Sequence, residues 1–144
     1  MAYIFKQKLN MSELSGIIEN PKKVLIHEPE EYLAALYSHY LQAHNFDIKH
    51  CPNLEQIRES INSFRPDVLV FSVDASSQPA APARIWKLLP YLRSSFPDLR
   101  LISTGLGGGN YMPELMAAGV LGHINRSLHR PQDLGIIIKS ILQV

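Results

Sequence analysis

Residues 65–75 read RPDVLVFSVDA, in which a Pro-Asp pair precedes a nearly apolar run followed by a lone acid, Asp74. Only Ser72 is polar within the run, and its β-branched residues do not alternate with polar ones. Such a run is typical of a strand covered on both faces, at the centre of a parallel sheet. Because functional groups of open parallel sheets gather at the carboxyl ends of the strands, we expect a site near Ser72 and Asp74.

The rest of the chain alternates between strand-like and helix-like segments around this central strand. Parallel strands joined by helical crossovers carry helices on both faces of the sheet. The sequence therefore predicts an α/β protein of the flavodoxin-like (βα)5 class, a three-layer sandwich whose parallel five-stranded sheet has the order 2-1-3-4-5. The expected strands are residues 22–26, 46–50, 68–73, 99–103 and 122–125, and the expected helices are residues 30–43, 54–64, 84–96, 112–118 and 131–142.

Several single residues predict where these helices begin, end or bend. We expect Asn53 to cap the second helix, and Pro131 to lie in the first turn of the last one. Gly119 is expected to end the short helix before it. Pro90 should bend or break its helix, since proline removes one backbone hydrogen bond.

Composition limits the classes of protein to which the chain can belong. Its 144 residues suit one domain, predicted at residues 21–144 after an N-terminal extension of residues 1–20. A net charge of +1 with no dense run of Lys and Arg argues against nucleic acid or an anionic membrane as partner. The single cysteine excludes an internal disulfide, and no apolar run reaches the roughly 20 residues of a membrane span. We expect a cytoplasmic protein.

Other motifs give weak support for cofactor or metal chemistry. The glycine stretch GLGGGN at residues 105–110 follows a strand, but it lacks the GxGxxG spacing of dinucleotide sites and follows the wrong strand. His27 and His123 can approach the Ser72 end of the sheet, where a metal site with Glu28 is an alternative that we do not favour. Ser72 has no GxSxG turn around it, so hydrolase chemistry is rejected. We expect no enzyme activity, no cofactor and no metal.

Five pieces of the chain together resemble the receiver domain of two-component response regulators. In order, they are VLIHEPEEYLAALYSHYL, RPDVLVFS, PDLRLISTG, AAGVLGHINRSL and HRPQDLGIIIKSIL, within residues 22–144. The resemblance implies a site in which two acids after the first strand hold Mg²⁺, an Asp accepts a phosphoryl group, and a Thr or Ser and a Lys contact that group.

The residues at these positions depart from the receiver pattern. Glu28 matches the first acid but Pro29 stands at the second, and Ser72 stands at the acceptor position. Asp74 comes two residues too late. Thr104 matches the Thr/Ser position and Arg126 the Lys position, where Arg126 either pairs with Glu28 or is solvated. The vestigial phosphorylation site is therefore predicted to comprise Glu28, Ser72, Asp74, Thr104 and Arg126.

The resemblance implies a non-catalytic pseudo-receiver, a signalling module that acts by protein-protein interaction and independently of phosphorylation. Ser cannot form an acyl phosphate, and one carboxylate binds Mg²⁺ poorly. Two alternatives remain open. One is a flavodoxin-like domain that binds a small ligand or nucleotide with its strand-end loops, and the other is an active receiver that uses Asp74.

A partner surface is predicted around the last strand and last helix. On a helical wheel, Leu134, Ile138 and their neighbours form the core stripe, whereas Ile136 points away. The preceding helix also has apolar residues to spare, and His123 stands where receivers usually carry an aromatic switch residue. The resemblance implies a histidine kinase, another signalling protein or a second copy as the partner. The expected interaction face comprises Tyr111, Met112, Met116, His123 and Ile136.

Overall fold

The computed structural model describes residues 21–73, 81–105 and 112–144, and within these ranges the side chains of residues 81–84 and 86 are not described. A five-stranded parallel sheet runs through the protein in the order β2-β1-β3-β4-β5, as predicted. The strands are β1 (Lys23–His27), β2 (Asp47–His50), β3 (Val68–Ser72), β4 (Arg100–Gly105) and β5 (Val120–Asn125).

The Pro-Asp pair before β3 fixes how the central strand meets its neighbour β1. The Asp67 carboxylate accepts a hydrogen bond of 2.8 Å from the Lys23 backbone N–H, and the Asp67 N–H donates one of 2.8 Å to the Lys23 carbonyl. Val68 then pairs with Val24 on one side and with Arg100 on the other. The apolar run is therefore central because both of its edges carry strands.

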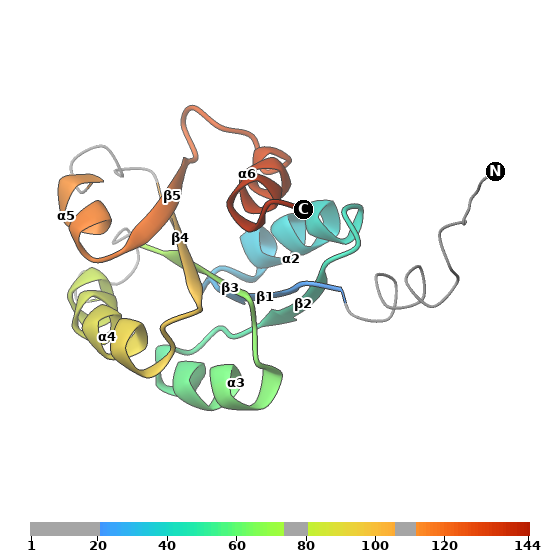
Figure 1. Cartoon of the computed structure of the whole chain (residues 1–144). Coiled ribbons are helices and arrows are strands. Elements are labelled where there is room, and N and C mark those ends of the chain that lie inside the picture. The colour runs from blue at the N-terminus through green and yellow to red at the C-terminus, as the bar shows by residue number, and fades with distance from the viewer. Residues whose placement is uncertain (1–20, 74–80, 106–111) are drawn as a thin grey trace.

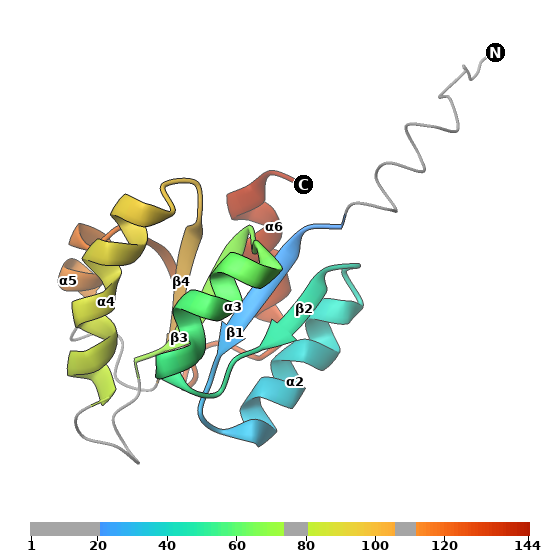
Figure 2. The same ribbon diagram turned by 90° about the horizontal axis from the view of Figure 1, so that it is seen from below.

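Helices cover both faces of the sheet, which gives the three layers visible in Figures 1 and 2. On one face lie α2 (Glu31–Gln42) and α6 (Asp133–Leu142). On the other lie α3 (Ile57–Phe64), α4 (Ala81–Ser95) and α5 (Met112–Ala117), with the short 3-10 turn η1 (Leu54–Gln56) leading into α3.

Alternation along each strand divides the core into two clusters. Val24, Ile26, Val68 and Val70 face α2 and α6, while the intervening residues face the other three helices. Tyr37 and Leu41 of α2 and Leu134 and Ile138 of α6 complete the first cluster. Burying each such large side chain contributes roughly 1.5–3 kcal/mol.

The structure corrects three of the predictions about helix ends. Asn53 makes no side-chain capping bond, because the chain enters α3 through η1. α4 starts at Ala81, earlier than predicted, and continues through Pro90, which it holds at an exposed position while Leu89 and Leu92 pack in the core. The last helix starts at Asp133, two residues after Pro131. The prediction for Gly119 agrees with the structure, because α5 ends just before it and its φ of 93° suits glycine.

Several predicted features lie outside the described residues. They are the extension of residues 1–20, Asp74 with the loop of residues 75–80, the glycine stretch after Gly105, and Tyr111. Within the described ranges, no helix is long and apolar enough to cross a membrane.

Candidate functional site

The predicted site residues that the structure describes lie at the carboxyl ends of four strands. Glu28 follows β1, Ser72 ends β3, Thr104 lies in β4 beside Ser72, and Arg126 follows β5. Two residues before each of them is a buried side chain of the cluster under α2 and α6: Ile26, Val70, Ile102 and Ile124. Since side chains alternate along a strand, all four predicted residues belong to the α2/α6 face of the sheet.

Tyr37 of α2 extends into this group of residues. Its side chain is only 2% exposed, and its hydroxyl group hydrogen bonds with the Thr104 side chain. The charges of Arg126 and Glu28 both act on the phenol. One helical side chain thus hydrogen bonds with a residue of β4 and is affected by the charges that follow β1 and β5.

The environment of Tyr37 keeps its phenol protonated. Burial raises the pKa of Tyr37 above its ordinary value of 10.0, because the charged form is disfavoured in an apolar surrounding. The Arg126 charge opposes this rise in pKa, the Glu28 charge adds to it, and the bond to Thr104 opposes it. At neutral pH the Tyr37 hydroxyl group is therefore neutral, while the charges of Arg126 and Glu28 act on it in opposite directions.

The spacing of the apolar residues in α2 predicts only that Tyr37 lies on the buried face of the helix. Leu33, Tyr37 and Leu41 recur at four-residue spacing, and that pattern predicts burial without regard to the phenol oxygen. A signal was present, because a buried tyrosine hydroxyl usually needs a hydrogen-bond partner. Tyr37 lies in the middle of the apolar face of α2, so its hydroxyl group could be expected to have a hydrogen-bond partner inside the protein.

The described residues do not fit a Mg²⁺ ion. Glu28 is 4% exposed, and its Oε2 accepts a hydrogen bond of 3.0 Å from the Glu30 N–H. Pro29, beside it, offers no carboxylate. No group of three or more His, Cys, Asp or Glu side chains that could hold a metal occurs in the described part of the chain. A hard divalent cation prefers several carboxylate or carbonyl oxygens.

The protein resembles known proteins in its structure but not detectably in its sequence. No protein-family model matches the sequence, and no curated protein matches it. Among solved structures, a response regulator from Thermotoga maritima has a TM-score of 0.75 at 14% identity, covering 87% of this chain and 100% of its own. A CheY-like receiver domain from Methanospirillum hungatei has a TM-score of 0.72 at 16% identity, covering 86% of this chain and 95% of its own.

The protein has the fold of a response-regulator receiver domain. An orphan response regulator of H. pylori agrees with this, at a TM-score of 0.70 and 12% identity over 84% of this chain and 96% of its own. At these identities the likeness establishes the fold, and function must be argued from residues.

Two histidines near the end of β1 donate hydrogen bonds to backbone carbonyl groups. Nδ1 of His27 donates a hydrogen bond of 2.9 Å to the Cys51 carbonyl, and Nε2 of His50 donates one of 2.8 Å to the Glu28 carbonyl. His27 follows the alternation of Leu25 and so lies on the face opposite Tyr37. These bonds fasten the turn after β1 to the end of β2.

His123 also lies on the face away from Tyr37. Its Nδ1 is 2.7 Å from the Ser103 hydroxyl oxygen, and the two groups hydrogen bond. Its Nε2 is buried and has no hydrogen-bond partner among the described residues. Burial lowers the pKa of His123 below its ordinary value of 6.5, and the neighbouring His129 charge lowers that pKa further. The receiver fold therefore holds His123 neutral at physiological pH.

The predicted interaction face is only partly exposed. Met116 on α5 is 66% exposed and Ile136 on α6 is 60% exposed, whereas Met112 packs against the core. The structure adds Leu121 of β5, which is 56% exposed. β5 is the edge strand between α5 and α6 (Figure 1). Sequence reasoning missed Leu121 because alternation does not reveal that it is an extra residue in the pairing with β4.

Proposed function

We propose that this protein is a pseudo-receiver: a cytoplasmic signalling module with the receiver fold that performs no phosphoryl chemistry and acts through protein-protein contacts. The single observation that supports this most is the place of Tyr37. Its hydroxyl group bonds the Thr104 side chain, the one that would otherwise contact a phosphoryl group in a receiver. A working site needs that hydroxyl available.

The other positions support the same proposal. Ser72 has a hydroxyl group where a receiver carries its acceptor carboxylate, and a serine phosphate would be an ester and not the reactive acyl phosphate. Glu28 has Pro29 beside it, so the metal would lack its second acidic ligand. The site is then a fixed hydrogen-bonded structure that holds one conformation of the domain.

A domain that keeps one conformation can signal only if a partner protein binds that conformation. We propose that recognition takes place at the β5 face, which we define as the exposed apolar residues Met116, Leu121 and Ile136. These residues come from three consecutive elements on both sides of the edge strand (Figure 1). The partner is another signalling protein or a second copy of this chain.

The first prediction is that phosphoryl donors leave the protein unchanged. The protein is incubated with acetyl phosphate and Mg²⁺, and its intact mass is then measured beside an active receiver domain treated identically. We expect the active receiver to gain one phosphate and this protein to gain none, because Ser72 and Pro29 replace the required carboxylates.

Asp74 supplies the control for this experiment. A mass gain of one phosphate that disappears in Asp74→Ala would restore the alternative of an active receiver. A gain that persists in Asp74→Ala but disappears in Ser72→Ala would show phosphorylation of the serine, which also contradicts the proposal.

A further inference from the structure

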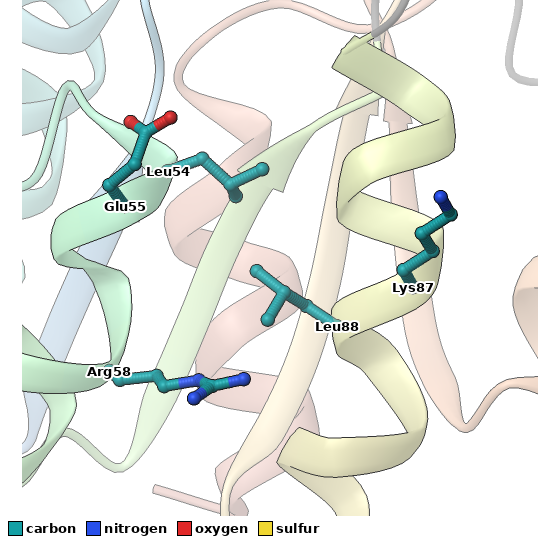
Figure 3. Close-up of a pocket in the computed structure, with 5 residues that line it drawn as sticks. All are labelled: Leu54, Glu55, Arg58, Lys87 and Leu88. Atoms are coloured by element: carbon teal, nitrogen blue, oxygen red, sulfur yellow. The ribbon is translucent and has the colours of Figure 1, made fainter.

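A groove separates α3 from α4 on the sheet face opposite Tyr37. It has a volume of about 450 Å³ and is lined by Leu54, Glu55, Arg58, Lys87 and Leu88. Figure 3 shows Leu54 and Leu88 directed toward each other across the space between the helices, with Arg58 reaching from α3 toward α4. The groove shares no residue with the Tyr37 site or the β5 face.

The floor of the groove is apolar and incompletely covered. Leu54 and Leu88 are both half-buried, and both pack against the core cluster under α3 and α4. Their remaining apolar surface faces the groove, where a bound group would remove it from water. The floor therefore favours a ligand that carries a large apolar side chain.

Arg58 is held in place by an aromatic ring. Its guanidinium carbon lies 4.2 Å from the centroid of the Tyr91 ring, and Tyr91 in turn meets Phe96 edge-on at 6.2 Å. A guanidinium group stacked on a ring keeps its edge N–H groups for a carboxylate. Because the side chain is already ordered, less conformational entropy is lost when an anion binds.

The groove carries an excess of positive charge. Among the described residues, neither Arg58 nor Lys87 makes an ion pair or a hydrogen bond, and they come from different helices. Glu55 is the one acid in the lining, and it already takes part in an interaction. Two cations and one acid thus flank the apolar floor, which leaves the groove lining with a net positive charge.

We propose that this groove docks a short segment of a partner protein in which acidic side chains flank a large apolar one. The apolar side chain covers Leu54 and Leu88, and the carboxylates pair with Arg58 and Lys87. A phosphate-rich polymer would gain nothing from the leucine floor. This surface does not depend on the inert phosphorylation site, so the proposal stands or fails separately from the pseudo-receiver function.

The test is an NMR titration of the isotope-labelled full chain with a short synthetic peptide of Glu and Leu. A peptide of the same pattern with Lys in place of Glu is the reference. We expect amide shifts concentrated at Leu54, Arg58, Lys87 and Leu88 with the acidic peptide and none there with the basic one. The shifts should weaken as salt is raised, because exposed charge pairs are screened.

Charge reversal identifies the residues responsible. The double variant Arg58→Glu/Lys87→Glu should bind the acidic peptide at least about tenfold more weakly, which corresponds to the loss of roughly 1.4 kcal/mol. The matched control, Lys22→Glu/Lys139→Glu, changes the net charge equally at sites away from the groove and should bind normally. If the charge-reversed protein has a lowered melting temperature, Arg58→Gln/Lys87→Gln replaces it.

Three results would overturn the proposal. They are the absence of shifts at the groove, equal shifts with the basic peptide, and unchanged affinity in both groove variants. Binding of inorganic phosphate or a nucleotide at the same residues, with no effect of the peptide, would also overturn it and assign the groove to a small anion.

Discussion

At the scale of single residues, Tyr37 is the side chain on which the proposed pseudo-receiver function depends most. It is held by burial and by one hydroxyl-hydroxyl bond at the point where Arg126 and Glu28 exert their charges. Thr104 is 1% exposed, so neither partner of this bond has ready access to water. Removing one hydroxyl group leaves the other buried and unsatisfied.

The second prediction is that Tyr37→Phe destabilises the fold by roughly 1–3 kcal/mol, the usual cost of leaving a buried polar group without its partner. Chemical denaturation of wild type and variant measures the change. Tyr40→Phe is the matched control, because Tyr40 lies on the same helix but is less buried. Equal stabilities of wild type and Tyr37→Phe would show that the bond to Thr104 does not hold the site together.

The places of the described site residues at the strand ends could be predicted from the sequence, whereas the place of Tyr37 could not. Ser72, Thr104 and Arg126 follow from where strands end, since parallel strands bring their carboxyl ends together. Tyr37 lies on a helix. Helical periodicity predicts which face of the helix is buried, but it does not predict which group the tyrosine hydroxyl contacts there. Asp74 lies outside the described residues, so its place stays a prediction.

At the scale of elements, α6 shows that a helical wheel can predict which residues of a helix are buried and which are exposed. The wheel predicted Leu134 and Ile138 as core and Ile136 as outward, and the structure has the first two fully buried and the third 60% exposed. The same reasoning was incomplete for α5, where Met112 turned out to pack on the core. In that helix of six residues, the exposed Met116 and the partly buried Met112 are hard to tell apart by helical period alone.

The third prediction is that Ile136→Glu weakens self-association or partner binding while the monomer stays folded. Burying an isoleucine at an interface contributes roughly 1.5–3 kcal/mol, or about ten- to a hundredfold in affinity. Sedimentation velocity gives the association, and a thermal melt gives the stability. Ala35→Glu, at an exposed position of α2, is the control.

Two outcomes of this comparison would count against the β5 face. Unchanged association and partner binding in Ile136→Glu would remove the interface. Equal losses in Ile136→Glu and Ala35→Glu would show a general effect of negative charge.

The expected cap at Asn53 and an expected break at Pro90 were wrong, because neighbouring contacts outweighed local propensity. Pro90 lacks a backbone N–H, yet α4 persists through it because Ile85, Leu89 and Leu92 anchor the helix on the core. Asparagine is a common helix cap, but Asn53 precedes the 3-10 turn η1 and its side chain makes no capping hydrogen bond. By contrast, the sheet order was predictable, since strand-helix alternation leaves few topologies.

At the scale of the whole molecule, stability should depend on pH at both ends of the range. His123 has a lowered pKa in the folded state, so the unfolded chain binds a proton more readily there. Its contribution is present above pH 6.5 and is lost as the pH falls below that value. Tyr37 has a raised pKa, so its contribution is present below pH 10.0 and is lost as the pH rises above it.

The fourth prediction is therefore a stability that declines on both sides of neutrality, with each decline assigned to one residue. Unfolding by urea across a pH series measures it. His123→Gln should flatten the acid decline, because glutamine can still bond Ser103 but does not titrate. Tyr37→Phe should flatten the alkaline decline. An unaltered pH profile in either variant would place the titrating group elsewhere.

The pairing of β5 with β4 has a consequence for how copies of the molecule can assemble. Val120 pairs with Leu101 and Gly122 with Ile102, so Leu121 is an extra residue that interrupts the ladder of this edge strand. Such a bulge twists an edge away from regular pairing, and an unbroken edge is a template for the strands of other chains. The opposite edge, β2, has only the four residues DIKH, two of them charged. Both open sides of the sheet thus resist the stacking of strand upon strand that leads to fibrils, and association is left to side chains that can form a closed pair.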